Sequence, residues 1–384
     1  DFSGQIQAVK KNATGNQQQE EVFMKVAIIG AGLAGLACAH ELERLGIIPD
    51  LYEKNGYIGE PFNHSTAMLR IIDRPPHGDY LRYFMEKLYL DIKPLAPVKR
   101  MMHNSPAKKK MVTGKNLGFL FLRSNTRDSV KNQLCETLSK TRVFLSNLAD
   151  LSTLKKKYDF VVVANGNNLY TKEYGLWQTW FNGYVRAAVV HGNFDTSRID
   201  MWINQHYCRN GYAYLTPFSD KKASLILVVS DCDERDINEY WNAFLYYEDL
   251  KYPIIEEFTL YHTSGYVYPK IIDNVIFAGA AGGSIDPFLG FGQFNSLSMG
   301  VFAARTIVQG LDYHRQCRYI TKKNLYLQQL RQGFNQLDNE GYDSLIASIG
   351  FPGVRTLLYK TSINWIPLGS SIIKQINKRQ LRIG

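Results

Sequence analysis

A glycine-rich turn near the start of the chain limits the possible folds more than any other feature. It follows a β-branched run at residues 26–29, precedes an Ala- and Leu-rich segment at residues 36–45, and reads Gly30-Ala31-Gly32-Leu33-Ala34-Gly35. This pattern is typical of a buried parallel strand, a tight turn and a helix. Gly30 permits the turn, Gly32 lets the backbone approach a pyrophosphate, and Gly35 allows close packing of the helix on the strand. Free N–H groups at the helix start favour an anion, so the segment predicts a dinucleotide-binding site.

A second apolar strand is predicted at residues 50–53, and it ends in a carboxylate. Glu53 is placed to accept hydrogen bonds from the hydroxyl groups of an unphosphorylated adenosine ribose, and Lys54 follows it. We therefore include Glu53 and Lys54 in the predicted cofactor site. The turn and the carboxylate alone leave both NAD and FAD open as the dinucleotide.

Composition excludes several classes of protein. The 384 residues are 45% hydrophobic and 21% charged, which is typical of a globular chain with two domains or one large α/β unit. Five cysteines are scattered singly without a C-x-x-C pair, which argues against a disulfide framework or a zinc site and favours a reducing cytosol. The histidines show no paired metal-ligand spacing, and no apolar run is as long as a membrane-spanning helix.

The two ends of the chain differ from its middle. Residues 1–23 form a polar, Gln-rich leader, which we leave out of the predicted fold. Residues 345–384 contain no acidic residue and six basic ones, so they supply +6 of the formal net charge of +10. Lys374, Lys378 and Arg382 are spaced by four and would form one stripe on a helix. Such a tail suits either a solvated helix packed on the body or a peripheral contact with an anionic membrane, whereas no recognised module supports nucleic-acid binding.

Three segments far from the glycine-rich turn carry further motifs. The first is a strand, a turn and a helix start, and its turn contains Gly279, Asp286, Pro287, Gly290, Phe291 and Gly292. Proline stiffens such a loop, and glycines let backbone N–H groups meet a flat anionic ligand at the start of a helix. The second segment is a buried strand that ends in Ala164-Asn165-Gly166. The third is a predicted helix that begins near Arg127. Arg123 is the alternative candidate for the arginine of this segment.

Together these segments resemble the FAD-dependent oxidoreductases of the glutathione-reductase-2 or p-hydroxybenzoate-hydroxylase-like fold, nearest the geranylgeranyl-reductase-like branch. The stretch at residues 279–292 is similar to the family's G-D-A-A-G-x-x-x-P-x-x-G-x-G segment, and residues 164–166 to its A-D-G motif. Arg127-x-x-Val130-x-x-x-Leu134 is similar to its R-x-x-L-x-x-x-L helix. The resemblance implies an α/β fold with a Rossmann-like FAD-binding domain, an inserted, mostly antiparallel β-sheet substrate domain and a helical C-terminal tail. It also implies FAD as cofactor, with NAD(P)H or ferredoxin as possible electron donors.

Two positions depart from the family pattern. The aspartate expected after Gly279 is Ala280, which cannot supply the carboxylate that meets the ribityl chain, and Asn165 replaces the aspartate of A-D-G. These changes leave three outcomes open: weaker FAD binding, a contact from Asp286 or a backbone group in place of that aspartate, or loss of FAD in a degenerate homologue. Because the glycines are all present, we expect FAD binding to be retained.

The resemblance also divides the chain into segments. We expect the discontinuous FAD-binding domain at residues 24–67, 123–180 and 266–330, the substrate domain at residues 68–122 and 181–265, and a helical basic region at residues 331–384. The substrate segments are rich in aromatic residues, which suit either an apolar pocket for a prenyl-like chain or an ordinary sheet core.

Three residues are candidates for supplying a proton near the flavin. The segment at residues 211–217 resembles in part the Y-x-W-x-F-P signature of geranylgeranyl reductases, which makes Tyr212 and Tyr214 candidates. His64 follows a stretch similar to the reductases' G-E-P-x-x-C loop and is either a proton donor or a plain loop histidine.

The sequence therefore predicts an FAD-dependent enzyme that reduces a carbon–carbon double bond in a small apolar or lipid substrate, by hydride transfer from flavin N5. One alternative is an FAD-dependent aromatic monooxygenase on the same fold. The other is a non-catalytic flavin- or lipid-binding homologue, which the changes at Ala280 and Asn165 would suit.

Overall fold

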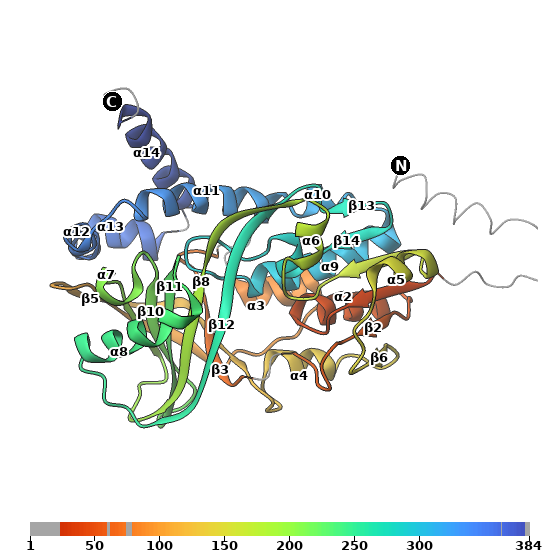
Figure 1. Ribbon diagram of the computed structural model, residues 1–384, viewed down its shortest axis with the longest axis horizontal. Helices are drawn as coiled ribbons and strands as arrows, with labels where there is room; N and C mark the ends of the chain where they lie inside the picture. Colours follow the sequence, from red (N-terminus) through yellow and green to blue (C-terminus); the bar gives the residue numbers. More distant parts are fainter. Residues whose placement is uncertain (1–23, 60–61, 74–78, 362, 381–384) are drawn as a thin grey trace, which may run out of the picture.

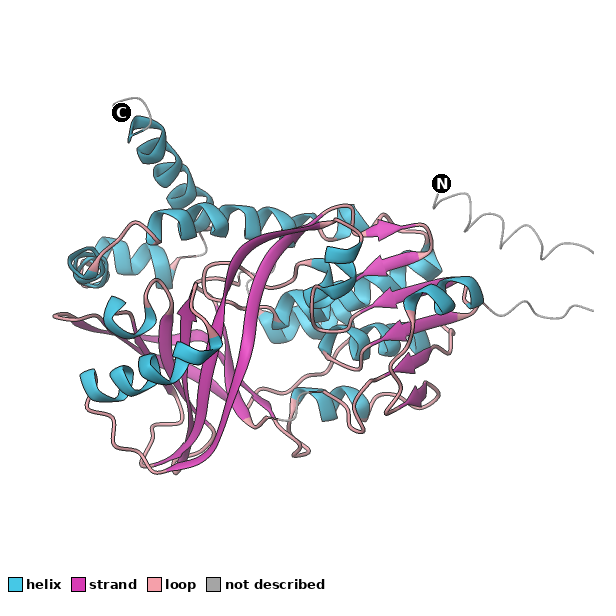
Figure 2. Ribbon diagram, viewed as in Figure 1, coloured by secondary structure: helices cyan, strands magenta, loops and turns pink. Residues whose placement is uncertain are grey.

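Two β-sheets, each packed against helices, form the body of the molecule (Figures 1 and 2). The computed structural model describes residues 24–59, 62–73, 79–361 and 363–380, so the leader at residues 1–23 lies outside the described part. The predicted fold class is confirmed: a Rossmann-like sheet, a second, mostly antiparallel sheet and a set of C-terminal helices.

Sheet A is the Rossmann-like sheet, with the strand order β13-β14-β7-β1-β2-β6. Its strands are β1 (Val26–Ile29), β2 (Asp50–Tyr52), β6 (Arg142–Phe144), β7 (Phe160–Val163), β13 (Ile271–Ile272) and β14 (Val275–Phe277). All neighbours are parallel except β13 and β14. The parallel pairing brings the ends of β1, β7 and β14 to one edge, so the glycine-rich turn, residues 164–166 and Gly279 follow adjacent strands.

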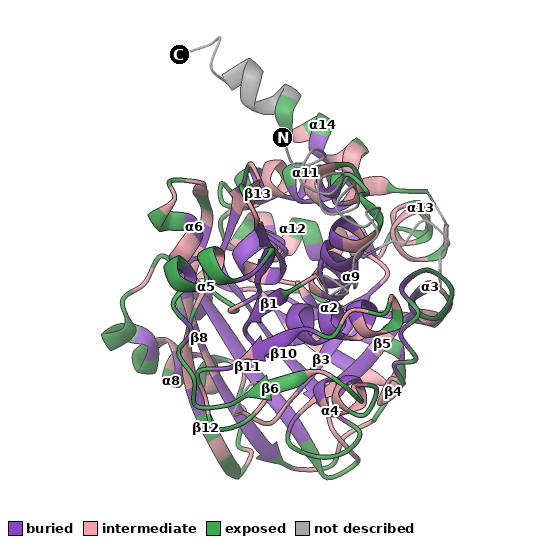
Figure 3. Cartoon of the chain, turned by 90° about the vertical axis from the view of Figure 1, so that its right-hand side faces the viewer, coloured by how far each residue is buried: buried purple, intermediate pink, exposed green. Residues whose placement is uncertain are grey.

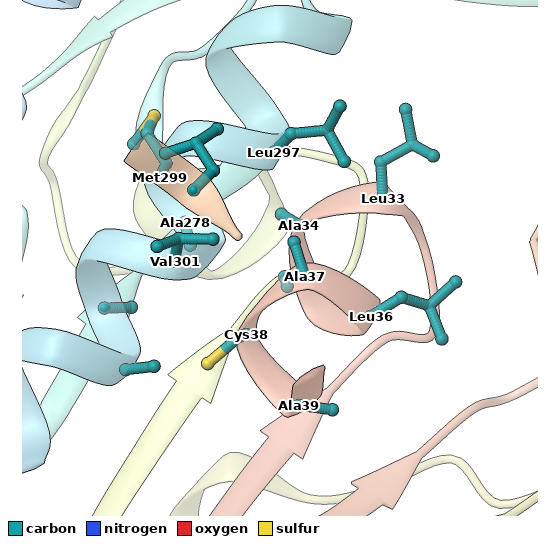
Figure 4. Packing of buried hydrophobic residues seen from close by; sticks show 14 of the residues in the cluster. Leu33, Ala34, Leu36, Ala37, Cys38, Ala39, Ala278, Leu297, Met299 and Val301 are labelled. Atoms are coloured by element: carbon teal, nitrogen blue, oxygen red, sulfur yellow. The ribbon is translucent and has the colours of Figure 1, made fainter. Parts of the chain in front are cut away.

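The central strands of sheet A are buried on both faces. Ile28 of β1 belongs to one hydrophobic cluster, whereas Ala27 and Ile29 belong to another on the opposite face. The covering helices are α2 (Leu33–Arg44) and α9 (Gln293–Gln309) on the first face, with α5 (Leu151–Lys157) and α6 (Leu169–Glu173) on the second. Figure 4 shows the first cluster, in which small side chains of α2 meet buried side chains of α9. A strand buried on both faces must be apolar at every position, which explains the continuous VAII run.

Sheet B has the order β12-β8-β11-β10-β9-β4-β5-β3, in which only β4 and β9 pair in parallel. Its strands are β3 (His64–Leu69), β4 (Ala96–Asn104), β5 (Lys109–Arg123), β8 (Trp177–His191), β9 (Arg198–Trp202), β10 (Tyr212–Pro217), β11 (Lys222–Ser230) and β12 (Ile254–Val267). Four strands cross the segment boundaries expected from the sequence, because β3 begins at His64, β5 ends at Arg123, β8 begins at Trp177 and β12 ends at Val267.

The outer face of sheet B is covered by α7 (Gln205–Cys208) and α8 (Ile237–Tyr247), whose aromatic side chains share a core with β10 and β11. Other short elements lie around sheet A and its edges. They are α3 (Tyr80–Tyr83) with a π-helical turn (Phe84–Leu88), α4 (Val130–Cys135), α10 (Tyr313–Gln316) and the 3₁₀ turn Gly279–Gly282. A second 3₁₀ turn (Glu234–Asp236) leads into α8 beside sheet B. Figure 3 shows buried strands at the centre and an exposed edge at β6.

The C-terminal region is helical. It comprises α11 (Arg318–Phe334), α12 (Asn339–Ile349), α13 (Pro352–Arg355), a π-helical turn (Thr356–Lys360) and α14 (Trp365–Gln380). In Figure 1, α11 runs from the sheet A side towards the sheet B side, and α14 projects from the body. Lys374 is exposed on α14, whereas Lys378 and Arg382 lie outside the residues whose side chains are described. Within the described ranges, no helix has both the length and the apolar character needed to cross a membrane.

Candidate functional site

A cavity of about 430 Å³ lies between the strand-end edge of sheet A and one face of sheet B. The sheet A side of its wall is built from glycine-rich turns and two helix starts, whereas the sheet B side is largely aromatic. The predicted cofactor residues that line it are Gly32, Leu33, Ala34, Ala164, Gly166, Gly279, Gly290, Phe291 and Gly292. All three candidate proton donors, Tyr212, Tyr214 and His64, line it as well.

The first helix start at the cavity belongs to α2. Gly32 is its N-cap, no side chain caps the helix, and the first turn contains no acidic residue. The N–H groups there are therefore available to a negatively charged ligand. Gly30 has φ +101°, and a Cβ on it would lie 2.4 Å from the carbonyl oxygen of Ala164, so the turn requires glycine at this position.

Glu53 fixes the shape of this turn. One carboxylate oxygen accepts a hydrogen bond from the backbone N–H of Ala31 at 2.9 Å, and the other accepts one from the N–H of Asn55 at 2.9 Å. Glu53 is 7% exposed and lies behind the cavity wall rather than on it, while Lys54 is exposed. A carboxylate has about four acceptor positions, so these two bonds leave capacity for ribose hydroxyl groups.

The second helix start at the cavity belongs to α9. Gly292 is its N-cap without a side-chain cap, and the first turn again contains no acidic residue. Gly290 precedes it with φ +69°, which only glycine adopts readily. Ala280 also lines the cavity, at the position where the family has an aspartate. Two uncapped helices of 12 and 17 residues thus begin at the same cavity.

Asp286 is not placed for the cofactor contact that the sequence left open. It is fully buried and does not line the cavity, so it does not replace the carboxylate missing at Ala280. Its two oxygens accept hydrogen bonds from the backbone N–H groups of Phe288, Leu289 and Phe291, each at 2.8 Å. Burial raises the pKa of Asp286 to about 6. Asp286 therefore shapes the loop that carries Gly290, and the neighbouring Pro287 is buried beside it.

Arg127 also lies away from the cavity. Its side chain is 85% exposed and forms an ion pair with Glu136 at 2.9 Å. The competing choice, Arg123, lines the cavity at the end of β5, where burial lowers its pKa to about 10. A helix-start arginine on a solvated surface has the same sequence pattern as one beside a cofactor, so the spacing alone does not place Arg127 at this cavity.

Asn165 occupies the strand end beside the cavity without lining it. Its amide nitrogen donates to the Oδ1 of Asn167 at 2.9 Å, and its Oδ1 is buried without a partner among the described residues. Asn167 and Asn168, which the sequence did not single out, do line the cavity.

The sheet B wall holds the candidate proton donors. Tyr212 and Tyr214 of β10 have ring centroids 6.1 Å apart, and the Tyr212 hydroxyl donates to the carbonyl oxygen of Leu289. Burial raises the pKa of Tyr214 and, more strongly, that of Tyr212. Burial lowers the pKa of His64 to about 4, so this imidazole is neutral at pH 7. Both tyrosines therefore retain their protons at neutral pH, whereas His64 carries no extra proton to give.

Sequence reasoning missed His262 of β12, which also lines the cavity. Burial lowers its pKa to about 4. A Cβ on Gly290 would lie 2.7 Å from the Nε2 of His262 and 2.9 Å from the Tyr212 hydroxyl, so both side chains reach the loop before α9. No motif marks this histidine, because only the pairing of β12 with β8 brings it to the cavity.

Several buried polar atoms of the cavity residues have no hydrogen-bond partner in the described part of the chain. They are the Nδ1 of His64, the Oε1 of Gln293 and the Nδ2 of Asn168. Buried polar groups are nearly always hydrogen-bonded in folded proteins, so unpaired ones in a cavity wall indicate a ligand with polar edges. The glycine cradle, two uncapped helix starts and this set of donors and acceptors fit a dinucleotide carrying a flat heterocycle.

The two sheets and the cavity define the class of α/β proteins with a Rossmann-like domain and a second, mostly antiparallel sheet. Residues 28–77 match the family of NAD(P)-binding Rossmann-like domains. Among curated proteins, the chain is similar to digeranylgeranylglycerophospholipid reductase of Methanococcus vannielii, with 24% identity over 309 residues, or 74% of this chain and 77% of that protein.

Solved structures agree with this class. A geranylgeranyl bacteriochlorophyll reductase-like protein from Thermoplasma acidophilum superposes with a TM-score of 0.70 and 15% identity, covering 92% of this chain and 95% of that one. A flavin-dependent brominase superposes with a TM-score of 0.65 and 16% identity, covering 94% and 99%. These likenesses confirm the fold and agree with the geranylgeranyl-reductase-like branch that the sequence motifs indicate.

Proposed function

We propose that this protein is an FAD-dependent oxidoreductase that reduces a carbon–carbon double bond in an apolar, prenyl-like substrate. The observation that carries the proposal is the convergence of two uncapped helix starts on one cavity whose opposite wall is aromatic. The similarity to digeranylgeranylglycerophospholipid reductase supports this type of oxidoreductase.

The residues around the cavity suit FAD in three places. The N-terminus of α2 and the turn at Gly32 would hold the pyrophosphate, and Glu53 would accept hydrogen bonds from the ribose. The N-terminus of α9 at Gly292 would face the flavin edge that becomes negative on reduction. When bound and reduced, FAD supplies the hydride.

The remaining cavity residues would bind and protonate the substrate. Phe62 and Phe258 stack with ring centroids 4.2 Å apart and provide an apolar surface with Leu260. Tyr212 is the best-placed proton donor, because its hydroxyl lies against the loop that leads into α9. Exclusion of water from this wall would protect the reduced cofactor.

Reoxidation of the reduced cofactor tests the proposal most directly. The purified protein is denatured and the released cofactor identified, and the native protein is then photoreduced without oxygen and mixed with a geranylgeranylated glycerophospholipid. We expect FAD, reoxidation by the unsaturated lipid, and no reoxidation by its saturated counterpart. A protein that stays colourless after incubation with FAD would contradict the proposal.

The alternative monooxygenase function predicts a different outcome. The likeness to a flavin-dependent brominase motivates this comparison. A monooxygenase would form a hydroxylated product only with oxygen and NAD(P)H, whereas a double-bond reductase needs no oxygen. A yellow protein whose reduced flavin no unsaturated lipid reoxidises would favour the non-catalytic binding function instead.

We also propose that the C-terminal region meets the substrate's membrane. Leu368 and Ile372 of α14 are exposed one helical turn apart, Lys374 is exposed near them, and the tail contains no acidic residue. The double variant L368Q/I372Q should bind anionic vesicles less tightly than the unchanged protein. The variant L148Q, at a site 82% exposed between β6 and α5, is the matched control and should bind normally. Equal vesicle binding by all three proteins would contradict this role.

A further inference from the structure

A buried arginine on α11 has no carboxylate within ion-pair distance in the described part of the chain, although Asp231 attracts it from farther away. Arg331 is 2% exposed and pairs with no carboxylate among the residues that the structure describes. Its Nε and Nη2 are buried without a hydrogen-bond partner in the same described part. A buried charge is strongly destabilising unless it is paired, so an unpaired one is a candidate for a functional role.

The guanidinium is held by aromatic rings instead. It lies 4.7 Å from the ring centroid of Phe181 on β8 and 5.7 Å from that of Phe334. Phe181 in turn packs edge-on against His262, with ring centroids 5.7 Å apart. Cation–π contacts hold a positive charge in place without neutralising it.

This charge lies one layer behind the cavity wall. Arg331 interacts electrostatically with both Tyr212 and His262, which are the two side chains that reach Gly290 before α9. Phe181, whose ring contacts the Arg331 guanidinium, belongs to the same buried hydrophobic cluster as Tyr212, so the cation lies close to that cluster. Interactions of this kind are strong in a region from which water is excluded.

We propose that Arg331 is a positioning residue that stabilises the phenolate left on Tyr212 after it gives its proton to the substrate. The inference rests on the proposed function. In that step the carbon–carbon π bond breaks as one carbon receives the hydride supplied by the reduced cofactor and its neighbour receives the proton of Tyr212. Two C–H bonds form, the O–H bond breaks, and water then returns a proton to the phenolate. A two-electron donor such as NAD(P)H restores the reduced cofactor.

Other groups around Tyr212 raise its pKa and so oppose the effect of Arg331. Burial is the main cause that raises the pKa of Tyr212, and Tyr214 and Asp286 raise it further, whereas Arg331 lowers it. His262 is neutral at pH 7 and adds no charge. Arg331 is thus the cation that favours ionisation of Tyr212 among these neighbours. Tyr214 has a different cation beside it, Arg123, and is separately testable.

Three variants of the full-length holoenzyme test the inference. R331M removes the charge at similar length, R331K keeps the charge, and R318M removes an exposed arginine from the same helix as a control. The readout is single-turnover reoxidation of the photoreduced protein by the unsaturated lipid across a range of pH. We expect R331M to react more slowly by roughly tenfold or more, with R331K closer to the unchanged protein and R318M equal to it.

A second comparison separates this role from a purely structural one. In a Y212F background, R331M should cause little further loss of rate, because the phenolate it stabilises is absent. An undiminished effect of R331M in Y212F, or an R331M protein with full FAD content and the unchanged rate and pH profile, would overturn the inference. If R331M does not retain FAD, the R331K variant provides the test. A tenfold lower reoxidation rate in R331K with full FAD content would also overturn the inference.

The link between the two residues is measurable even if the proposed reaction fails. With tyrosine labelled by carbon-13 at the ring carbon that bears oxygen, the Tyr212 signal is assigned by its loss in Y212F. Its chemical shift at neutral pH should change in R331M and stay unchanged in R318M, because the nearby charge polarises the Tyr212 hydroxyl. Failure of the proposed function appears as no reoxidation by any unsaturated lipid, whereas failure of this inference appears as a Tyr212 signal that R331M leaves unmoved.

Discussion

A Cβ on Gly300 of α9 would lie 2.1 Å from the carbonyl oxygen of Ala34 in α2, so the two helices touch at backbone distance. Figure 4 shows Ala34 and Ala37 of α2 together with the buried side chains of α9 around this contact. Because both helices begin at the cavity, their spacing sets the distance between the two uncapped N-termini there. Gly300 therefore links core packing to the geometry of the proposed cofactor site.

The variant G300A tests this link. An added methyl group must push α9 from α2, which should lower the free energy of unfolding by about 1–3 kcal/mol and weaken FAD binding. Denaturant unfolding and FAD titration measure the two effects. At Gly353 a Cβ would meet no atom within 4 Å, so G353A is the matched control and should change stability by less than about 0.5 kcal/mol. If G300A is destabilised but binds FAD with unchanged affinity, the spacing of α2 and α9 does not control cofactor binding.

Asp286 should make the loop before α9 sensitive to pH. Its pKa is raised from 3.8 to about 6 mainly by burial, so the folded protein binds a proton more tightly than the unfolded chain. Its contribution to stability is full below about pH 4 and declines as pH rises through 6. Because D286N cannot ionise, its stability loss relative to the unchanged protein should be largest near pH 4 and shrink towards pH 7. Unfolding free energies of both proteins, measured across this range, test the prediction. A stability loss in D286N that grows with pH would show that the three N–H bonds lower the pKa of Asp286 more than burial raises it.

The sequence predicted local backbone features better than side-chain placement. The turn at Gly30 and the loop at Gly290 need positive φ angles, and a glycine at each position indicates this directly in the sequence. The partners of Asp286 and Arg127 depend on the folded loop and the protein surface, which spacing does not encode. No motif marks Arg331. Its Nε and Nη2 lack hydrogen-bond partners in the described part of the chain, and this becomes apparent only when α11 is packed in the fold.

Three histidines, His103 buried and His64 and His262 half-buried, should make the protein sensitive to acid. The pKa values of His64, His103 and His262 are each lowered from 6.5 to about 4, chiefly by burial. The unfolded chain therefore binds more protons than the folded protein between pH 4 and 6.5, and the stability due to each neutral imidazole is lost as pH falls through that range. H103Q should reduce the slope of unfolding free energy against pH by up to about 1.4 kcal/mol per pH unit. H191Q, at an exposed position, is the control, and an equal effect of both variants would contradict the assignment to burial.

A buried ion pair should anchor α11 to the body. Lys323 of α11 bonds to Asp73, which follows β3, and both side chains are 3% exposed. K323M leaves the carboxylate buried and unpaired, which should cost about 3–5 kcal/mol of unfolding free energy. The double variant D73N/K323M should lose less than the sum of the single losses, as a double-mutant cycle would show. Strict additivity would mean that the two side chains are not energetically coupled.

Ala280 offers the sharpest test of where the cofactor lies. It lines the cavity at the position where the family has an aspartate, and Asp286 does not take over that role. If the ribityl chain of FAD passes this point, A280D should add one hydrogen bond to it. A bond of about 0.5–1.5 kcal/mol corresponds to FAD binding that is roughly twofold to tenfold tighter, measurable by fluorescence titration of the protein stripped of cofactor. A control substitution, A280N, keeps a similar size without the charge and should give a smaller gain. Weaker FAD binding by A280D would mean that the added carboxylate faces the pyrophosphate or another negative group, and the cofactor would then have to be placed differently in the cavity.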